Sequence, residues 1–386
     1  MTHKHVLGGA LLVAGTSIGA GMLGLPVLTG LGGFGPAVLV YLLCWLFMTC
    51  TGLLLLEICL KMPPDANLVS MATTYLGRPG KVLAWVLYLF LFYCLSIAYV
   101  SGGGSFLREW LGLSSFTSAG ILFVLIFSPF VYFGTKRVDR LNLLLMIGLI
   151  GSFLLFVIFS LPHVQLHLLN EVHWGPAILA LPIVFTSFSY QGIIPSLTTY
   201  MQRDASKIRM AIVLGTTLTF VTYLFWEFLI LGIVPVEGLE KARMLGQTAV
   251  QPLKEHVPYG SIVFVGEAFG FLAIATSYLG VTLGLFDFLA DGFRMAKKGK
   301  QRAFLAAITF LPPLVIALAK PGVFLIALTY AGGIGCAVLL GLLPTVMVWT
   351  ARNRGESGPR MLPGGKPVLT MLMLFVVLEV AMELFA

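Results

Sequence analysis

Apolar stretches longer than about 18 residues recur along the whole of this 386-residue chain, and they constrain its fold more than any other feature. Each is long enough to cross the roughly 30 Å hydrocarbon core of a bilayer as a helix. Only 10% of the residues are charged, against about 25% in soluble domains. We therefore expect an all-α, polytopic membrane protein that is surrounded by a lipid bilayer and has almost no soluble part.

The sequence predicts eleven membrane-spanning helices. Two long polar connections, 61–81 and 235–260, follow the second and seventh spans, so each has the same place in a set of five spans but on opposite sides of the membrane. This arrangement predicts an inverted repeat of five helices plus five, with one extra C-terminal helix. The expected units are a first repeat over 1–161, a second repeat over 175–350, and a cytoplasmic loop with the eleventh helix over 351–386. The predicted spans are 6–29, 34–60, 81–106, 117–134, 141–161, 175–200, 210–234, 261–291, 302–319, 322–350 and 367–386.

Basic residues are distributed unevenly between the connections. A cytoplasmic N-terminus places 19 of the 24 Lys and Arg residues on the cytoplasmic side and five on the other side. The positive-inside rule then predicts a cytoplasmic N-terminus and a periplasmic C-terminus. The net charge of +8 reflects this loop bias, and no nucleic-acid partner is expected.

The first apolar run contains "GTSIGAGMLGLP" at residues 15–26, which is poor material for a continuous helix because Gly and Pro destabilise helix interiors. The sixth span, which would be its counterpart in an inverted repeat, has Pro182 and Pro195 around the polar centre "TSFSYQG". Broken helices survive in a membrane only where they line a cavity, and paired breaks indicate a transporter's binding site. The alternative is a packing seam, since Gly15 and Gly19 form a small-xxx-small pair.

A broken first span has useful dipole chemistry. An inner half-helix ending near Gly15 presents carbonyl groups, and an outer half beginning near 21–22 presents free N–H groups. These suit the ammonium and carboxylate of a zwitterionic amino acid. The hydroxyls of Thr16 and Ser17 add hydrogen bonds, and three aromatic residues of the sixth span are candidate walls for an apolar or aromatic side chain: Phe185, Phe188 and Tyr190.

Residues 15–19 also fit the G-x-S-x-G pattern of serine hydrolases, which makes an intramembrane serine hydrolase a distant alternative. A serine nucleophile needs a general base within hydrogen-bond reach. All six histidines fall in predicted tails or loops, and no lysine lies within a span near Ser17. We therefore expect neither enzymatic activity nor catalytic residues, and no cofactor or metal site is predicted.

Four stretches resemble the bacterial aromatic amino acid permease family, the tyrosine- and tryptophan-type permeases of the amino acid–polyamine–organocation group with the LeuT-type fold. They are "GTSIGAGMLGLP", "PIVFTSFSYQGIIPSL", "YLFWEFLILGIVP" and "TSYLGVTLGLFDFLADGF", and the similarity covers essentially the whole chain. The resemblance implies a bacterial inner-membrane symporter that imports aromatic amino acids, tyrosine first and tryptophan second, by alternating access. An exchanger or uncoupled facilitator is the alternative. Oligomeric state is not predicted.

The resemblance also implies a substrate site made from both breaks. This chain departs from the family pattern at Gln191, where such permeases often have His. Gln cannot titrate, but it can donate and accept hydrogen bonds. The implied site residues are Thr16, Ser17, Ile18, Gly19, Ala20, Gly21, Met22, Phe185, Thr186, Ser187, Phe188, Ser189, Tyr190 and Gln191.

Ionisable residues within predicted spans are candidates for binding a coupling ion. The acidic candidates are Glu57, Glu227, Glu267 and Asp287, for which salt bridging or snorkelling is the alternative. Thr276 and Ser277 could provide hard oxygen ligands for Na⁺, or could simply bond to helix carbonyls. The family resemblance implies H⁺ as the coupling ion, and Na⁺ is the alternative coupling ion.

Overall fold

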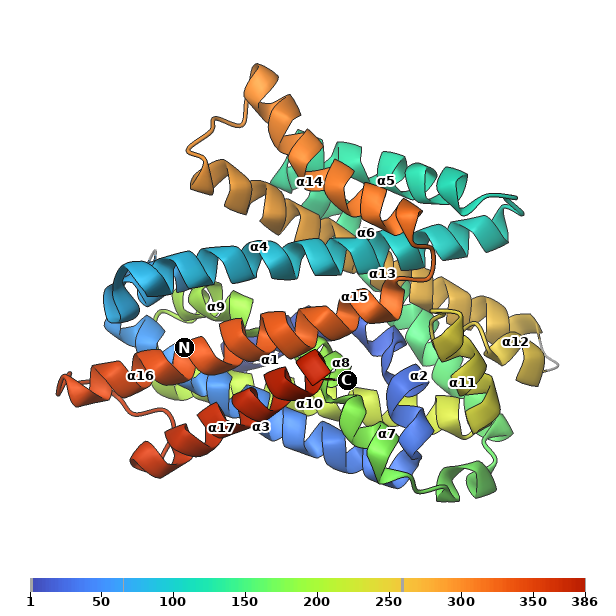
Figure 1. Cartoon of the computed structure of the whole chain (residues 1–386), viewed down its shortest axis with the longest axis horizontal. Helices are drawn as coiled ribbons and strands as arrows, with labels where there is room; N and C mark the ends of the chain where they lie inside the picture. Colours follow the sequence, from blue (N-terminus) through green and yellow to red (C-terminus); the bar gives the residue numbers. More distant parts are fainter. Residues whose placement is uncertain (1–2, 65, 258–259, 386) are drawn as a thin grey trace.

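Long helices packed side by side make up the whole molecule (Figure 1). The computed structural model describes residues 3–64, 66–257 and 260–385, so residues 65, 258, 259 and 386 of the predicted connections and spans lie outside the described ranges. Within those ranges nine helices are long and apolar enough to cross a membrane, and one bent pair brings the number to ten. The longest are α3 (Phe34–Lys61), α4 (Leu68–Trp110), α5 (Phe116–Phe133), α6 (Thr135–Ser160), α10 (Ala205–Leu231), α13 (Gly260–Gly292), α14 (Gly299–Ala319) and α17 (Gly365–Phe385). The prediction of an all-α polytopic membrane protein is confirmed.

The first span is broken, as predicted. It consists of α1 (His3–Ser17), η1 (Ala20–Leu23), α2 (Leu25–Thr29) and η2 (Gly30–Gly32), and its two halves are bent by 47°. Gly19 at the break has an extended backbone (φ −164°, ψ −152°), so the helical hydrogen-bond ladder stops there. The first half, α1, ends at Ser17, two residues later than expected, and the second half begins at Ala20.

The sixth predicted span is also broken. Four short segments form it: α7 (Trp174–Leu179), α8 (Leu181–Ser187), η5 (Gln191–Ile193) and α9 (Ile194–Tyr200). Pro182 and Pro195 lie in the first turns of α8 and α9, where the missing N–H group has no helical partner to lose. The prolines therefore begin new helical segments, and the chain between Ser187 and Gln191 is left non-helical.

The expectation of a polar loop over 61–81 is wrong for most of that range. Helix α4 begins at Leu68, where Asn67 and Ser70 form a reciprocal capping box with hydrogen bonds of 2.9 and 3.0 Å. The helix turns sharply at Gly77, whose φ of +69° favours glycine. The other long connection contains the two short helices α11 (Val236–Met244) and α12 (Leu253–His256).

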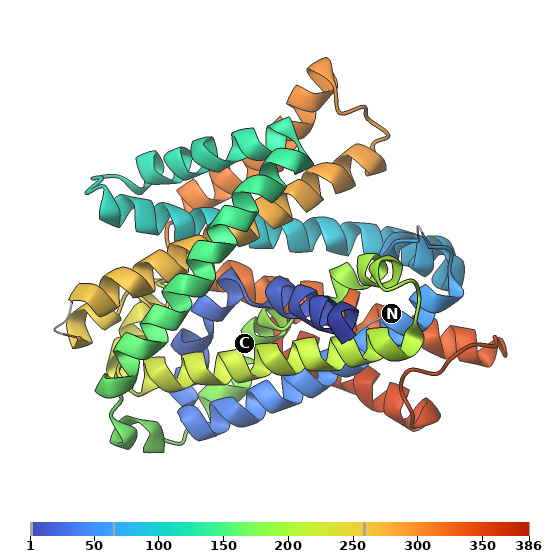
Figure 2. The same ribbon diagram turned by 180° about the vertical axis from the view of Figure 1, so that it is seen from behind.

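The tenth span joins α15 (Phe324–Tyr330) to α16 (Leu343–Asn353) through a π-helical segment, η6 (Ala331–Leu342). Gly332 in η6 lies directly against the backbone of Pro182 in α8, so no side chain would fit there. On the other side of the molecule α10 packs against both α1 and α3 (Figure 2). The two broken spans are thus held between α10 and η6.

Candidate substrate site between the two helix breaks

The two breaks touch one another. A Cβ atom built on Gly21 would lie 3.0 Å from the Ser187 Oγ and 3.1 Å from the Ser187 Cα. Any side chain at position 21 would therefore push η1 and the end of α8 apart. The close approach of two interrupted backbones explains why a residue without a side chain is needed at this point.

Tyr223 on α10 binds the C-terminal ends of α1, in the first span, and α8, in the sixth span. Its buried hydroxyl lies 2.6 Å from the Ser17 carbonyl oxygen and 2.7 Å from the Ser187 carbonyl oxygen. Trp226, one turn further along α10, donates from Nε1 to the Met22 carbonyl oxygen at 2.9 Å. Carbonyl groups freed by the breaks are therefore bound by α10, so the Ser17 carbonyl does not stand free for a ligand.

Ser277 on α13 contacts the break in the first span. The backbone N–H of Ala20 donates to the Ser277 Oγ at 3.1 Å, which satisfies one of the N–H groups exposed at the start of η1. A Cβ on Gly19 would lie only 2.5 Å from that same Oγ. The expected row of free N–H groups is therefore partly capped by a side chain that sequence reasoning assigned to ion binding.

A cavity of about 590 Å³ lies against the two breaks. Its polar side chains are hydroxyls and one amide, and aromatic rings with a thioether form much of the remaining wall. Within the described residues, no Asp, Glu, Lys, Arg or His lines it. It is lined by Gly15, Thr16, Ser17, Ile18, Gly19, Ala20, Gly21, Tyr88, Leu91, Phe92, Leu95, Tyr99, Asn142, Met146, Thr186, Ser189, Tyr190, Gly192, Ile193, Ser196, Thr276, Ser277, Gly280, Val281 and Leu340.

The structure places nine of the fourteen sequence-predicted site residues on this cavity: Thr16, Ser17, Ile18, Gly19, Ala20, Gly21, Thr186, Ser189 and Tyr190. The other five are Met22, Phe185, Ser187, Phe188 and Gln191, and they are buried elsewhere. The Phe185 ring packs on Phe47 and Phe375 at centroid distances of 5.0 and 5.8 Å. The Phe188 ring packs on Tyr223 at 5.0 Å, so neither ring reaches the cavity.

Gln191 joins the sixth span to α3. Its Nε2 donates to the Met48 carbonyl at 3.3 Å and to the Thr51 Oγ1 at 3.2 Å, and its Oε1 accepts from the Tyr190 N–H at 3.0 Å. The side chain is completely buried. Its hydrogen bonds therefore fix the path of the broken backbone.

Several cavity residues were not predicted from the sequence. They come from α4 (Tyr88, Leu91, Phe92, Leu95, Tyr99), α6 (Asn142, Met146), the sixth span (Gly192, Ile193, Ser196), α13 (Gly280, Val281) and η6 (Leu340). Asn142 carried the clearest signal, because an amide in an apolar span needs partners, and its buried Oδ1 accepts no hydrogen bond here.

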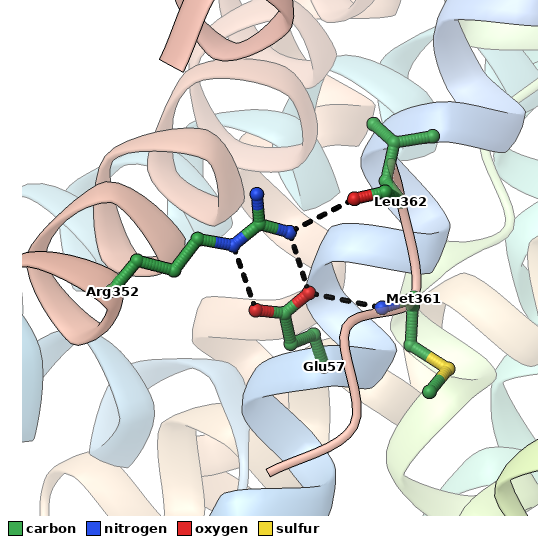
Figure 3. A network of polar contacts seen from close by, with 4 residues as sticks. All are labelled: Glu57, Arg352, Met361 and Leu362. Carbon is green, nitrogen blue, oxygen red and sulfur yellow. Dashed lines mark hydrogen bonds and ion pairs between the residues drawn. The ribbon is translucent and has the colours of Figure 1, made fainter. Parts of the chain in front are cut away.

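Glu57, a coupling-ion candidate, forms a buried ion pair (Figure 3). Its two oxygens accept from Arg352 Nε at 3.0 Å and Nη2 at 2.8 Å, and Oε2 also accepts from the Met361 N–H at 3.1 Å. Arg352 further donates to the Leu362 carbonyl at 3.1 Å. This network joins α3 to α16 and to the connection before α17, which is the salt-bridge alternative considered for Glu57.

Two other acidic candidates also form ion pairs. Asp287 accepts from Lys297 Nζ at 2.6 Å, and both side chains are about half exposed. Glu267 Oε1 forms an ion pair with Lys254 Nζ at 2.6 Å, and Glu267 Oε2 accepts from the Trp110 Nε1 at 2.9 Å. Glu227 differs from these, because its fully buried carboxyl group contacts two hydroxyls, Thr29 Oγ1 and Tyr41 OH, each at 2.6 Å.

Two interrupted spans in contact at the centre of an all-helical bundle define a class of membrane transport proteins, and solved structures of that class resemble this one. MhsT in complex with L-phenylalanine superposes with a TM-score of 0.65 at 16% identity, covering 98% of each chain. A manganese transporter of Eremococcus coleocola superposes with a TM-score of 0.61 at 15% identity, covering 98% of this chain and 85% of that one. The LeuT-type fold is confirmed.

The sequence model of the tryptophan/tyrosine permease family matches residues 2–383, and the chain belongs to this family. It is 33% identical to a tryptophan-specific transport protein of Pseudomonas aeruginosa, with 100% of this chain and 95% of the relative covered. It is also 33% identical to the tyrosine-specific transport system 2 of Haemophilus influenzae, with 97% and 95% covered. The protein is accordingly a permease, and the hydrolase alternative suggested by residues 15–19 is excluded.

Proposed function

We propose that this permease imports aromatic amino acids, tyrosine first and tryptophan second, through alternating access around the cavity at the two helix breaks. The observation that supports this most is the chemical composition of the cavity wall. Interrupted backbone and hydroxyl groups line one side, and Tyr88, Phe92, Tyr99 and Met146 line another. A volume of about 590 Å³ lies within the range of small-molecule sites.

The absence of charged side chains among the described lining residues suits a zwitterion. A ligand that carries both charges needs no net countercharge, and backbone dipoles at helix ends favour each charge separately. The N–H groups of Gly19 and Gly21 suit the carboxylate, while hydroxyls of Ser189 and Thr16 suit the ammonium. The aromatic wall suits the ring, which is the part that differs between tyrosine and tryptophan.

The position of the cavity indicates which state the structure represents. Lining residues from the first and sixth spans extend into their inner halves, down to Gly15 and Ser196, both of which are exposed. On the other side of the break, Met22 and Leu23 are completely buried, and the Leu23 carbonyl accepts from the Ala249 N–H at 2.8 Å. With the orientation predicted by the basic loops, this is an inward-facing state in the bacterial inner membrane.

Glu227 is our candidate for the residue that binds the coupling proton. Three short oxygen–oxygen contacts meet in its pocket: Thr29 Oγ1 to the Leu25 carbonyl at 2.7 Å, Thr29 Oγ1 to Glu227 Oε1 at 2.6 Å, and Tyr41 OH to Glu227 Oε2 at 2.6 Å. Two hydroxyls supply only two protons. All three contacts are hydrogen bonds only when the carboxyl group supplies the third, so a protonated Glu227 fits this geometry.

Glu227 on α10 contacts two other helices, so its protonation can affect how these helices pack. Thr29 lies in α2, the outer half of the first span, and Tyr41 lies in α3. Loss of the proton would place an unpaired carboxylate in the protein interior, which is costly. Protonation would therefore favour the packing of α2 against α10 and α3 that seals the outer side in this state.

Sodium coupling and exchange are the alternatives to proton symport, and an uptake experiment with separate ion gradients tests them. In this state Thr276 Oγ1 donates to the Leu272 carbonyl at 2.9 Å and Ser277 Oγ accepts from Ala20, so both hydroxyls already have partners. We expect proteoliposomes to accumulate labelled tyrosine and tryptophan under an inward proton gradient alone, and not under a sodium gradient alone. Accumulation with sodium only would overturn proton coupling, and the lack of saturable uptake of any aromatic amino acid would overturn the function.

A variant separates coupling from transport. Glu227→Gln keeps the shape of the side chain but cannot release a proton, so we expect tyrosine counterflow to continue while proton-driven accumulation is lost. Asp287→Asn, in an exposed ion pair, is the matched control and should retain both activities. Full proton-driven accumulation by Glu227→Gln would remove Glu227 from the mechanism.

A further inference from the structure

Two acidic residues lie one turn apart on α17, away from the cavity described above. Glu379 is only 1% exposed, and neither of its carboxyl oxygens has a hydrogen-bond partner. Glu383 lies close enough to interact electrostatically with it. A carboxyl group buried without a partner is rare, because each unsatisfied polar group costs about 1–3 kcal/mol and a charged one more.

The surroundings of this pair supply no countercharge. Glu383 lies against η6, where a Cβ on Gly333 would be 2.7 Å from its Oε2. The buried thiol of Cys44 on α3 is within electrostatic range of Glu379. Helix α8, which also packs on α17, has no ionisable side chain over Leu181–Ser187. No described Lys or Arg forms an ion pair with either carboxyl group.

A second cavity, of about 920 Å³, reaches one member of this pair, Glu383. Glu383 and Met382 form part of its wall, together with residues of α2, α7, α11 and α15. The charged or titratable groups along that wall are His173, Tyr330, Glu240 and Arg243, and the last two are paired with each other at 2.6 Å. The cavity therefore provides a route for a small ligand to Glu383, with the local cation already neutralised.

We propose that Glu379 and Glu383 form a proton-binding site at the contact of α17 with η6, distinct from Glu227. An ionised, unpaired carboxylate in this interior would be costly, and a second one beside it would add repulsion. A metal ion would need several oxygen ligands. Among the described residues, no group of three or more His, Cys, Asp or Glu side chains comes together. A proton needs only one carboxyl oxygen, so it fits the residues present.

The site has a mechanical consequence. Segment η6 contacts both α17 and α8, the latter through Gly332 and Pro182. Release of the proton would leave charge between α17 and η6 and weaken their packing. Proton binding at Glu379 therefore controls how firmly α17 supports the broken sixth span, whatever substrate the central cavity holds.

Infrared difference spectroscopy on the purified protein tests this without measuring transport. The C=O stretch of a protonated, buried carboxylic acid should be present in the wild type at neutral pH and should lose intensity in Glu379→Gln. Glu237→Gln, at an exposed site on α11, should leave the band unchanged. Equal band intensity in wild type and Glu379→Gln would overturn the proposal, and Glu227 does not confuse the result because it is present in both proteins.

Thermal unfolding is the second measurement. A carboxyl group that holds its proton in the folded state contributes stability at low pH, and this contribution is lost as pH rises through the pKa of the folded state. We expect the wild-type melting temperature to fall with rising pH by roughly 2–4 °C more than that of Glu379→Gln. Glu383→Gln should reduce the same pH dependence. Identical pH profiles would contradict the proposal, as would a melting temperature raised by Na⁺ or Ca²⁺ only when Glu379 is present.

Discussion

The hydroxyl group of Tyr223 lies 2.6 Å from the carbonyl oxygen of Ser17, the last residue of α1. The same hydroxyl reaches the Ser187 carbonyl at the end of α8. One side chain of an unbroken helix therefore binds the exposed ends of both broken helices. The two carbonyl groups share the single proton of this hydroxyl. Because the hydroxyl contacts both of them, its position fixes the distance between the two breaks.

Replacement of Tyr223 by Phe should keep the ring packed on Phe188 and remove only the hydroxyl. The two buried carbonyl groups would lose the one donor that they share, at a cost of about 1 kcal/mol or more. We expect the maximal rate of tyrosine uptake to fall roughly tenfold, with a lower melting temperature. Tyr93→Phe removes a hydroxyl bonded to the Ile308 carbonyl at 2.7 Å, far from the breaks in sequence, and should lower stability while leaving uptake near wild type.

Gly19→Ala should reduce substrate binding by forcing Ser277 away from the break. The new Cβ would meet the Ser277 Oγ at 2.5 Å and displace it from the Ala20 N–H. The double variant Gly19→Ala with Ser277→Ala should recover part of the binding, because it removes the clash. Gly151→Ala on α6 is the control, since a Cβ there has no neighbour within 4 Å and Gly151 does not line the cavity. Equal affinity of Gly19→Ala and wild type in a tyrosine-binding titration would refute this reading of the break.

Glu57→Gln should strongly destabilise the protein, because Arg352 would keep a buried charge without a partner. The side chains of this pair are 1% and 12% exposed, and breaking a buried pair costs about 3–5 kcal/mol. The double variant Glu57→Leu with Arg352→Met should be more stable than Glu57→Gln. Asp287→Asn breaks a pair that is 42% and 43% exposed and should cost about 1 kcal/mol or less. Melting curves of the four proteins check this order.

Selectivity among aromatic amino acids should depend on residues that line the cavity. Met146→Ala enlarges the cavity and should favour the larger indole ring, changing the ratio of tryptophan to tyrosine affinity by roughly tenfold. Phe188→Leu should lower stability but leave the ratio unchanged, because the Phe188 ring packs on Tyr223 outside the cavity. A competition panel of tyrosine, tryptophan and phenylalanine distinguishes the two. A changed ranking in Phe188→Leu would favour the role that the sequence alone predicts for it.

The orientation in the membrane can be tested by labelling from outside. Met244 on α11 is 73% exposed, and Lys298 lies in the exposed basic connection before α14. In a background without the native cysteines, Met244→Cys should react with an impermeant thiol reagent added to whole cells. Lys298→Cys should react only after the membrane is permeabilised. The opposite pattern would invert the proposed topology and make the described state outward-facing.

The breaks were predictable from sequence because Gly and Pro act locally. Pro182 and Pro195 each lie in the first turn of a helical segment, and Gly19 is the extended residue between α1 and η1. The backbone preferences of the two residue types account for both positions. The α4 wall of the cavity was not predictable in the same way. A helix inside a bundle is apolar on every side, so Tyr88 and Phe92 resemble residues that face lipid or protein.

The orientation of side chains within the breaks also required the structure. Phe188 and Gln191 follow the end of α8 at Ser187, and helical spacing no longer tells which way a side chain points there. The partners of Glu227 were equally hidden, because Thr29 and Tyr41 are 198 and 186 residues away along the chain.

In the substrate site that we propose, main-chain groups bind the amino acid moiety and side chains bind the ring, so mutation can replace only the second set of contacts. Substitutions along α4 and α6 would change the aromatic wall of the cavity, whereas the N–H groups of Gly19 and Gly21 belong to the main chain and are kept in every variant. New ring specificities are therefore accessible by single substitutions. A ligand without the amino acid moiety would leave these main-chain groups unused and would require a different course of the first span.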